Sequence, residues 1–324
     1  MWKNLLLMAL ILATITGCRQ ANEIKEIKLA HGLDPSHPVH KAMVIMGQKL
    51  KEKSNGRMKL EIYPSGQLGS EQQCVELLQI GSLAITKVSA AVMESFTDNY
   101  QVLGLPYVFK SKQHAFKVLD GEIGRELLTS TEPFNIRGLC FYDAGSRSFY
   151  TLNKPVKHPD DLQGLKIRVM KSQTAMSLVT AMGGSPTPIS WGELYTALQS
   201  GVVDGAENNP PSFYTSHHYE VCKHYTINEH TTVPDVLIIS TVVWNKLSAQ
   251  EKQWLQEAAN ESVIEERKLW AAAEKESLKK VQEAGVQVIY PDKEPFAEKV
   301  QALLDSYKEQ PELYNLIQRI QSTN

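Results

Sequence analysis

The chain has 324 residues, of which 42% are hydrophobic and 22% charged, so it is long enough for two domains of ordinary size, and disorder is not expected. Lys and Arg number 34 and Asp and Glu 36, giving a net charge of −2. The composition therefore argues against a DNA- or RNA-binding protein, which needs a basic excess to neutralise phosphates.

The N-terminus has the features of an export signal. A lysine precedes an apolar run at 5–13, which is too short for the ~20 residues that span a bilayer. The sequence ITGC at 15–18 resembles the lipobox of bacterial lipoproteins. We expect a signal peptide at 1–17, lipidation of Cys18 and a tether at 18–23. The alternative is an ordinary cleaved signal with a chance cysteine.

Strand and helix patterns alternate along the first hundred residues. Alternating polarity predicts strands at 23–30, 58–63 and 83–86, and apolar residues at helical spacing predict helices at 38–54 and 70–80. These lengths are typical of a parallel α/β sheet. A second α/β unit follows, with strands predicted at 137–142, 148–152 and 165–170 and helices at 159–162, 174–182 and 191–199.

The stretch 248–284 predicts one very long helix. It begins with a capping serine, contains no Pro or Gly, and is followed by Gly285. About 36 residues at ~1.5 Å each reach ~54 Å, which exceeds the diameter of a small domain. Since its apolar residues do not sustain a heptad seam, a helix bracing two lobes is the simplest interpretation. Two helices with an undetected break are the alternative.

A strand at 286–290 and a helix at 294–307 come after the long helix, so both lobes are expected to receive late segments of the chain. We expect lobe I to comprise 24–144 and 235–272, and lobe II to comprise 145–234 and 273–324. An exported, two-lobed α/β protein with a crevice between its lobes is the architecture of ligand capture by hinge closure. Binding is therefore the leading function class.

Two arginines at or beside strands are candidates for that crevice. Arg168 lies between apolar neighbours in a strand that reads as buried, so its charge needs an anionic partner. Arg147 lies at the start of another strand. A guanidinium matches a carboxylate with two hydrogen bonds, which suits an acidic ligand. A salt bridge to an internal acid explains Arg168 equally well at this point.

Six stretches in the same order resemble the solute-binding proteins of TRAP (tripartite ATP-independent periplasmic) transporters. They are LEIYPSGQLG at 60–69, GLP at 104–106, LQGLKIRVM at 162–170, MGGSPTP at 182–188, ELYTALQSGVVD at 193–204 and GAENNPP at 205–211. The resemblance implies a two-lobed α/β fold of the periplasmic-binding-protein kind, with mixed sheets, crossing strands and a long helix along both lobes. It further implies closure on an organic acid, without a cofactor, and delivery of that acid to a membrane permease.

The resemblance also assigns three polar residues to the ligand site. The family's carboxylate-binding arginine falls on Arg168, within the retained LKIRV pattern. Arg147 falls on a second arginine that many members use against the carboxylate or an adjacent oxygen. The family's pocket asparagine falls on Asn208, although an asparagine beside Pro210 and Pro211 also suits a turn.

Four further pocket positions follow from the resemblance, and two of them, Trp191 and Glu71, also have a plainer interpretation. Trp191 falls on a ligand-facing residue but also suits a core. His31 follows the first strand, where crevice residues are expected. Glu71 lies in a first helical turn, where the dipole alone favours a carboxylate. Ser89 stands where sialic-acid binders have an acid, which argues against that ligand.

The ligand class follows from the residues offered to it. Two arginines suit a carboxylate, whereas Glu71, His31 and Asn208 would pair with hydroxyl groups. The stretch 207–214 also resembles the subgroup associated with sugar acids. We therefore expect a hexuronate such as glucuronate or galacturonate. A C4-dicarboxylate, a keto acid and diketogulonate are the alternatives.

Other functions have less support in the sequence. Three scattered cysteines, Cys74, Cys140 and Cys222, read as buried small hydrophobes and not as a disulfide framework. The nine histidines suggest a metal-binding lipoprotein, but their spacing does not form a ligand set. An exported carbohydrate-active enzyme would need paired carboxylates or a nucleophile elbow, and neither is recognisable. We expect no catalytic residue and no metal.

Overall fold

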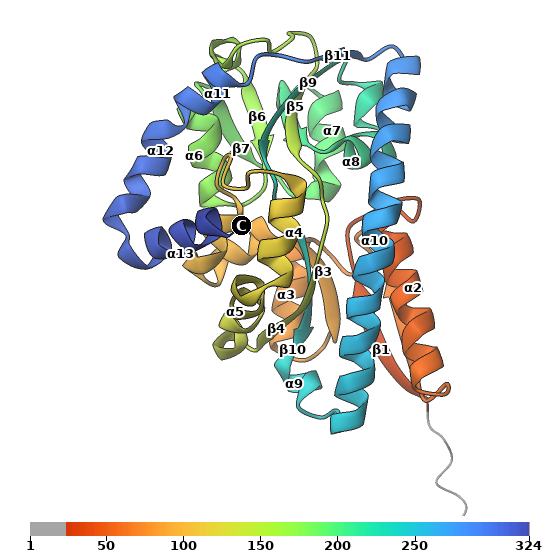
Figure 1. The fold of residues 1–324 in the computed structure, drawn as a ribbon. Coiled ribbons are helices and arrows are strands. Elements are labelled where there is room, and N and C mark those ends of the chain that lie inside the picture. Colours follow the sequence, from red (N-terminus) through yellow and green to blue (C-terminus); the bar gives the residue numbers. More distant parts are fainter. Residues whose placement is uncertain (1–23, 324) are drawn as a thin grey trace, which may run out of the picture.

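A computed structural model describes residues 24–323, and the chain forms two α/β lobes around two separate sheets (Figure 1). The expected signal peptide 1–17, the lipidation site Cys18 and the tether 18–23 lie outside the described residues. Within 24–323, none of the helices combines the length and the apolar character needed to cross a membrane.

The sheet of lobe I is mixed because one of its central strands arrives late in the chain. Its order is β2 (Met58–Tyr63), β1 (Lys25–Ala30), β3 (Ile85–Ser89), β10 (Asp235–Ser240) and β4 (Ile136–Tyr142). β10 is antiparallel to both neighbours. Along β10, Val236 and Ile238 enter one hydrophobic core and Leu237 and Ile239 enter the other, so the sheet is covered on both faces.

The sheet of lobe II is also mixed. Its order is β11 (Gln287–Ile289), β9 (His224–Thr231), β5 (Arg147–Thr151), β8 (Gly205–Asn208), β6 (Lys166–Val169) and β7 (Ser185–Pro188). β5 is antiparallel to β9 and β8, whereas β6 is parallel to β8 and β7. Adjacent residues Phe149 and Tyr150 of β5 belong to different cores, so this sheet too is buried on both faces.

Helices supply the outer layers of both lobes. In lobe I, α2 (Pro38–Lys53) packs on one face, and α3 (Glu71–Gln79), α4 (Lys112–Asp120), α5 (Glu122–Ser130) and α13 (Pro311–Ser322) pack on the other. In lobe II, α7 (Leu194–Gln199) and α8 (Pro210–Thr215) cover one face, and α6 (Gln173–Ala181) and α11 (Glu294–Lys299) cover the other. Of two further short helices, α9 (Thr241–Trp244) follows β10 directly and α12 (Gln301–Ser306) contacts α6.

The long helix α10 (Ala249–Glu283) is continuous over 35 residues, so the single-helix prediction is confirmed and the two-helix alternative is wrong. Ser248 and Glu251 form a capping box at its start. Leu255 belongs to a core of lobe I, whereas Val281 belongs to a core of lobe II. The helix therefore runs along both lobes (Figure 1).

Two short connections carry the chain between the sheets: 143–146 joins β4 to β5, and 232–234 joins β9 to β10. The first is held by α10, because the buried Glu266 accepts a hydrogen bond from the Asp143 backbone N–H at 3.0 Å. Gly145 in this connection has a φ of +56° and lies against Trp270. The expected crossing strands are therefore present, and α10 fixes one of the crossings.

The C-terminal segment differs from the sequence expectation in two ways. The helix expected at 294–307 is divided into α11, α12 and a terminal 3-10 turn. We also expected 273–324 to belong wholly to lobe II, but α13 places Leu313, Ile317 and Ile320 in a core of lobe I. The chain thus returns to lobe I at its end, because the apolar stripe of α13 finds its partners there.

The crossing at 143–146 generates a stability prediction for Gly145→Ala. A Cβ at Gly145 would lie 2.9 Å from Trp270 Nε1 and 3.1 Å from Glu274 Oε1. We expect a loss of about 1 kcal/mol from the positive φ and a further loss of about 1–3 kcal/mol from overpacking. Thermal unfolding followed by circular dichroism measures the effect.

Gly164→Ala is the matched control, since Gly164 also has a positive φ (+80°) but a methyl group added there would have no atom within 4 Å. Gly164→Ala should lose only the stability that the positive φ costs, without the loss from overpacking. Equal melting temperatures for the two variants would contradict the close packing of the crossing against α10.

Candidate ligand-binding site

A cleft with about 830 Å³ of atom-free space, its open mouth included, lies between the lobes. Both lobes contribute to its walls, since β3 and β10 belong to lobe I and β5, β6 and β8 to lobe II. Six of the seven residues expected at the site line it, namely Glu71, Ser89, Arg147, Arg168, Trp191 and Asn208. The seventh, His31, is not among the lining residues.

Arg168 is a buried cation of the cleft for which residues 24–323 supply no counterion. It lies in β6, is 2% exposed, and donates from Nε to the Ile189 carbonyl at 2.8 Å. Its Nη1 is buried without a hydrogen-bond partner, and no carboxylate of residues 24–323 forms a salt bridge with it. Burial lowers the pKa of the guanidinium, which reflects the cost of holding this charge away from water. The internal-acid interpretation of Arg168 is therefore wrong.

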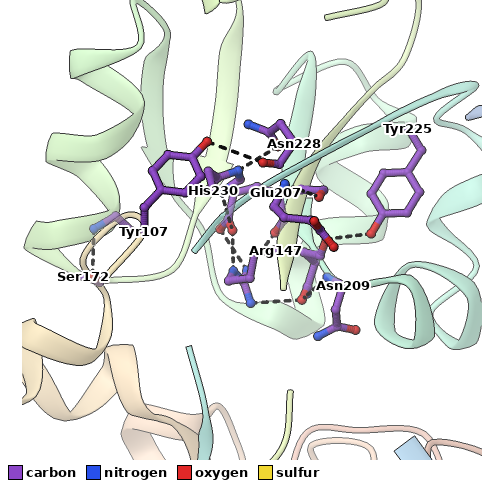
Figure 2. Close-up of polar contacts among 12 residues, drawn as sticks. Tyr107, Arg147, Ser172, Glu207, Asn209, Tyr225, Asn228 and His230 are labelled. Atoms are coloured by element: carbon purple, nitrogen blue, oxygen red, sulfur yellow. Dashed lines mark hydrogen bonds and ion pairs between the residues drawn. The ribbon is translucent and has the colours of Figure 1, made fainter. Parts of the chain in front are cut away.

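Arg147 does have an internal acid, in contrast to Arg168. It forms a buried salt bridge with Glu207, through Nε to one carboxylate oxygen and through Nη2 to the other at 2.9 Å (Figure 2). Burial alone would raise the pKa of Glu207, but the charge of Arg147 and a contact with His230 lower it to about 2. The charge of Arg147 is thus largely neutralised inside lobe II.

Asn208 is oriented by this salt bridge. Its side-chain oxygen accepts from Arg147 Nη1 at 3.0 Å and from the Asn209 backbone N–H at 2.9 Å. The Asn208 carbonyl accepts from Tyr225 at 2.8 Å, which holds the end of β8 in place. Because both acceptor contacts go to the oxygen, the amide N–H groups of Asn208 are the part left to serve a ligand oxygen.

The facing wall in lobe I contains a buried ion cluster of three residues. The Lys87 ammonium, 3% exposed, lies 2.8 Å from Glu71 Oε1 and 3.2 Å from Asp235 Oδ1. The second oxygen of Glu71 accepts from the Ser89 backbone N–H at 3.2 Å. Burial raises the pKa of Asp235 to about 6, with a contribution from the Glu71 charge, although Lys87 opposes the rise.

Trp191 of lobe II approaches the segment of lobe I that contains His31. The Trp191 ring lies 5.8 Å from the Arg168 guanidinium carbon, within cation–π range. Trp191 also approaches Gly32, the residue that follows His31. The His31 ring is hydrogen-bonded to His40 at 3.0 Å and to the Leu33 N–H, and burial together with the Lys87 charge lowers its pKa to about 3. His31 therefore stays neutral and supports the wall without lining it.

Contacts between the lobes surround the cleft. Glu94, in the 3-10 helix Ala90–Ser95 of lobe I, accepts from Ser172 Oγ at 2.9 Å and from the Thr174 N–H at 3.2 Å, at the start of α6 in lobe II. His37 of lobe I lies 3.2 Å from Ser212 Oγ of lobe II. The structure thus has the lobes in contact on more than one side of the cleft.

Sequence reasoning missed Lys87 and Asp235. Lys87 lies in the sequence ITKVS, so the pattern that singled out Arg168, a charge inside an apolar strand, could have found it. Asp235 begins β10, a strand that the sequence patterns did not predict. Only the antiparallel pairing of Asp235 with Ser89 brings it to the cleft.

The thiols and the candidate metal ligands of residues 24–323 form neither a disulfide nor a set of three metal ligands. Cys74, Cys140 and Cys222 are buried and free, as expected from their isolated apolar contexts. Within residues 24–323, no three His, Cys, Asp or Glu side chains gather in a way that could hold a metal ion.

Comparison with known proteins gives a family for the chain. Residues 29–310 match the family described as bacterial extracellular solute-binding protein, family 7. An uncharacterised Salmonella typhimurium protein, YiiZ, is 40% identical over 298 residues, which cover 91% of each chain.

Solved structures agree in fold. A TRAP periplasmic solute-binding protein from a Bradyrhizobium species, in complex with galacturonate, is 39% identical with a TM-score of 0.90, covering 92% of this chain and 100% of the other. One from Anaerococcus prevotii with bound glucuronate is 36% identical with a TM-score of 0.90, covering 93% and 98%. The chain therefore belongs to the family 7 bacterial extracellular solute-binding proteins, and among them to the solute-binding proteins of TRAP transporters.

Proposed function

We propose that this protein captures a hexuronate, such as glucuronate or galacturonate, between its lobes and delivers it to a TRAP membrane permease. The observation on which the proposal depends is the Arg168 guanidinium, which is buried in the cleft and forms no salt bridge with any acid of residues 24–323. The glucuronate and galacturonate bound by the similar proteins support the choice of ligand.

The ligand carboxylate would supply the counterion that Arg168 lacks. A guanidinium and a carboxylate can form two parallel hydrogen bonds, which fixes the acid end of the sugar. Arg147 acts mainly as a positioning residue in this proposal, since its charge is taken up by Glu207 and its Nη1 orients Asn208. The Asn208 amide would then donate to a ring or hydroxyl oxygen of the sugar.

The other end of the ligand would meet lobe I. Glu71 and Asp235 are acceptors for sugar hydroxyl groups, and Lys87 and Ser89 can donate to them. A ligand bound to both walls favours the closed arrangement, because it gains contacts there that an open cleft does not provide. The proposal requires no bond to be made or broken, so we assign no catalytic residue.

We further propose that the protein is exported and anchored to the cell envelope through a lipid on Cys18. The support for this is the ITGC sequence at 15–18 after a short apolar run. Fractionation and labelling with a fatty acid test it: the wild type should be recovered with membranes and incorporate the label, whereas Cys18→Ser should not incorporate it. Recovery of both proteins in the soluble fraction would exclude the anchor.

Arg168→Ala tests the ligand site. Losing the charged partner of a buried carboxylate costs roughly 2–5 kcal/mol, so galacturonate binding should weaken by about 30-fold to several thousand-fold. Isothermal titration calorimetry measures the change. Arg168→Lys keeps the charge without the planar fork, so its affinity for galacturonate should lie between those of the wild type and Arg168→Ala. Unchanged affinity in Arg168→Ala would refute the assignment.

Arg168→Met tests whether the unpaired charge is held at the expense of stability. A buried cation without a counterion destabilises the fold, and a methionine of similar length removes that charge. The melting temperature of the ligand-free variant should equal or exceed that of the wild type, while galacturonate no longer raises it. A marked fall in the ligand-free melting temperature would indicate a structural role instead.

Glu207→Gln tests the Arg147 salt bridge. Breaking a buried pair leaves Arg147 without its counterion, and we expect a loss of about 3–5 kcal/mol in the free energy of unfolding at pH 7. Because the pKa of Glu207 is lowered from 4.5 to about 2, its stabilisation is present above pH 4.5 and is lost as the pH falls toward 2.

Urea unfolding at several pH values between 7 and 3 separates the two effects. The wild type should lose stability below pH 4.5 more steeply than Glu207→Gln, which has no titrating group at this position. Parallel pH curves for the two proteins would show that Glu207 does not titrate as the geometry requires.

A further inference from the structure

We propose that the ion cluster of Glu71, Lys87 and Asp235 rejects ligands with a second carboxylate at the end remote from Arg168, so that the site accepts uronic acids and excludes the corresponding C6 dicarboxylic acids. The inference rests on the proposed function, and it names a selectivity that the proposed function does not contain. Glu71 and Asp235 thereby become specificity-determining residues.

The charges of the lobe I wall do not cancel. Lys87 is a single ammonium, and it is shared by two carboxylates at 2.8 and 3.2 Å. All three side chains line the cleft, and those of Lys87 and Asp235 are only 3% and 10% exposed. With both acids ionised, this wall therefore has a net charge of −1 in a region where water screens little.

The lobe II wall has the opposite sign. The Arg147–Glu207 salt bridge is neutral as a pair, so the unpaired Arg168, together with the exposed Lys171 that also lines the cleft, leaves this wall positive. The cleft is thus polarised between its two walls. A ligand with a carboxylate at one end and hydroxyl groups at the other matches both, because hydroxyl groups can donate to Glu71 and Asp235.

A second carboxylate at the far end cannot make those contacts. It has no proton to donate to the two acids, and it would add a like charge to a wall that is already negative. Lys87 compensates only in part, since two of its three N–H groups are already directed to Glu71 and Asp235 and one is left for the ligand. Burial raises the pKa of Asp235 to about 6, and the charge of Glu71 adds to this rise, which agrees with the geometry of two acids that share one ammonium.

The test compares galacturonate with galactarate, which has the same carbon skeleton with a carboxylate at each end. Calorimetric titration at pH 7.5 should give the wild type an affinity for galacturonate at least about 100-fold above that for galactarate. Glu71→Gln and Asp235→Asn each bring the wall to neutrality while keeping an oxygen that accepts from Lys87. Each should reduce the ratio about tenfold or more.

Glu76→Gln is the matched control, since Glu76 lies on the same helix α3, is exposed and is not among the residues lining the cleft. It should keep the wild-type ratio. Ligand-free melting temperatures verify that each variant is folded. If one of the two wall variants does not fold, the other still tests the inference.

Three outcomes overturn the inference, and each is distinct. If the wild type binds galactarate as tightly as galacturonate, the wall does not select. If the wild type selects but both wall variants keep its ratio, the selection has another cause. If the wild type binds neither acid, the proposed function itself fails and the inference falls with it.

Discussion

A buried guanidinium without a counterion is the constraint around which the cleft is built. Arg168 is 2% exposed, and within residues 24–323 it finds only a backbone carbonyl and the face of Trp191. Desolvating a charge is costly unless it is paired, so this residue makes the ligand-free protein less stable than its packing would allow. An anion that enters the cleft removes that cost, which is why the unpaired state suits a binding protein.

Arg147 shows what the same side chain does when the fold supplies an acid. Its bidentate salt bridge with Glu207 neutralises the pair, and the remaining Nη1 contact orients Asn208. Two arginines only a short distance apart in the sheet therefore have different physical roles. One offers a charge to the ligand, and the other holds a neutral amide in position for it.

Strand order explains how residues distant in the sequence form these walls. In lobe II, the strands β5, β8 and β6 are neighbours in the sheet, so Arg147, Asn208 and Arg168 come together where these strands border the cleft. In lobe I, Asp235 pairs with Ser89 because β10 returns antiparallel to β3. The two crossings at 143–146 and 232–234 enter these strands directly at the cleft. The closure that we propose would therefore act on the site itself.

Local patterns in the sequence predicted most helices and strands and the continuous helix α10, because periodicity and capping act over a few residues. The export signal is likewise an expectation from a local pattern. The family motifs further pointed to six residues that line the cleft. Only the tertiary structure decided that α13 returns to lobe I and that His31 supports the wall without lining it. It also decided that Glu207 neutralises Arg147, whereas nothing within residues 24–323 neutralises Arg168. Those outcomes depend on which distant side chains share a buried space, and charge compensation in such a space is a property of neighbours in three dimensions.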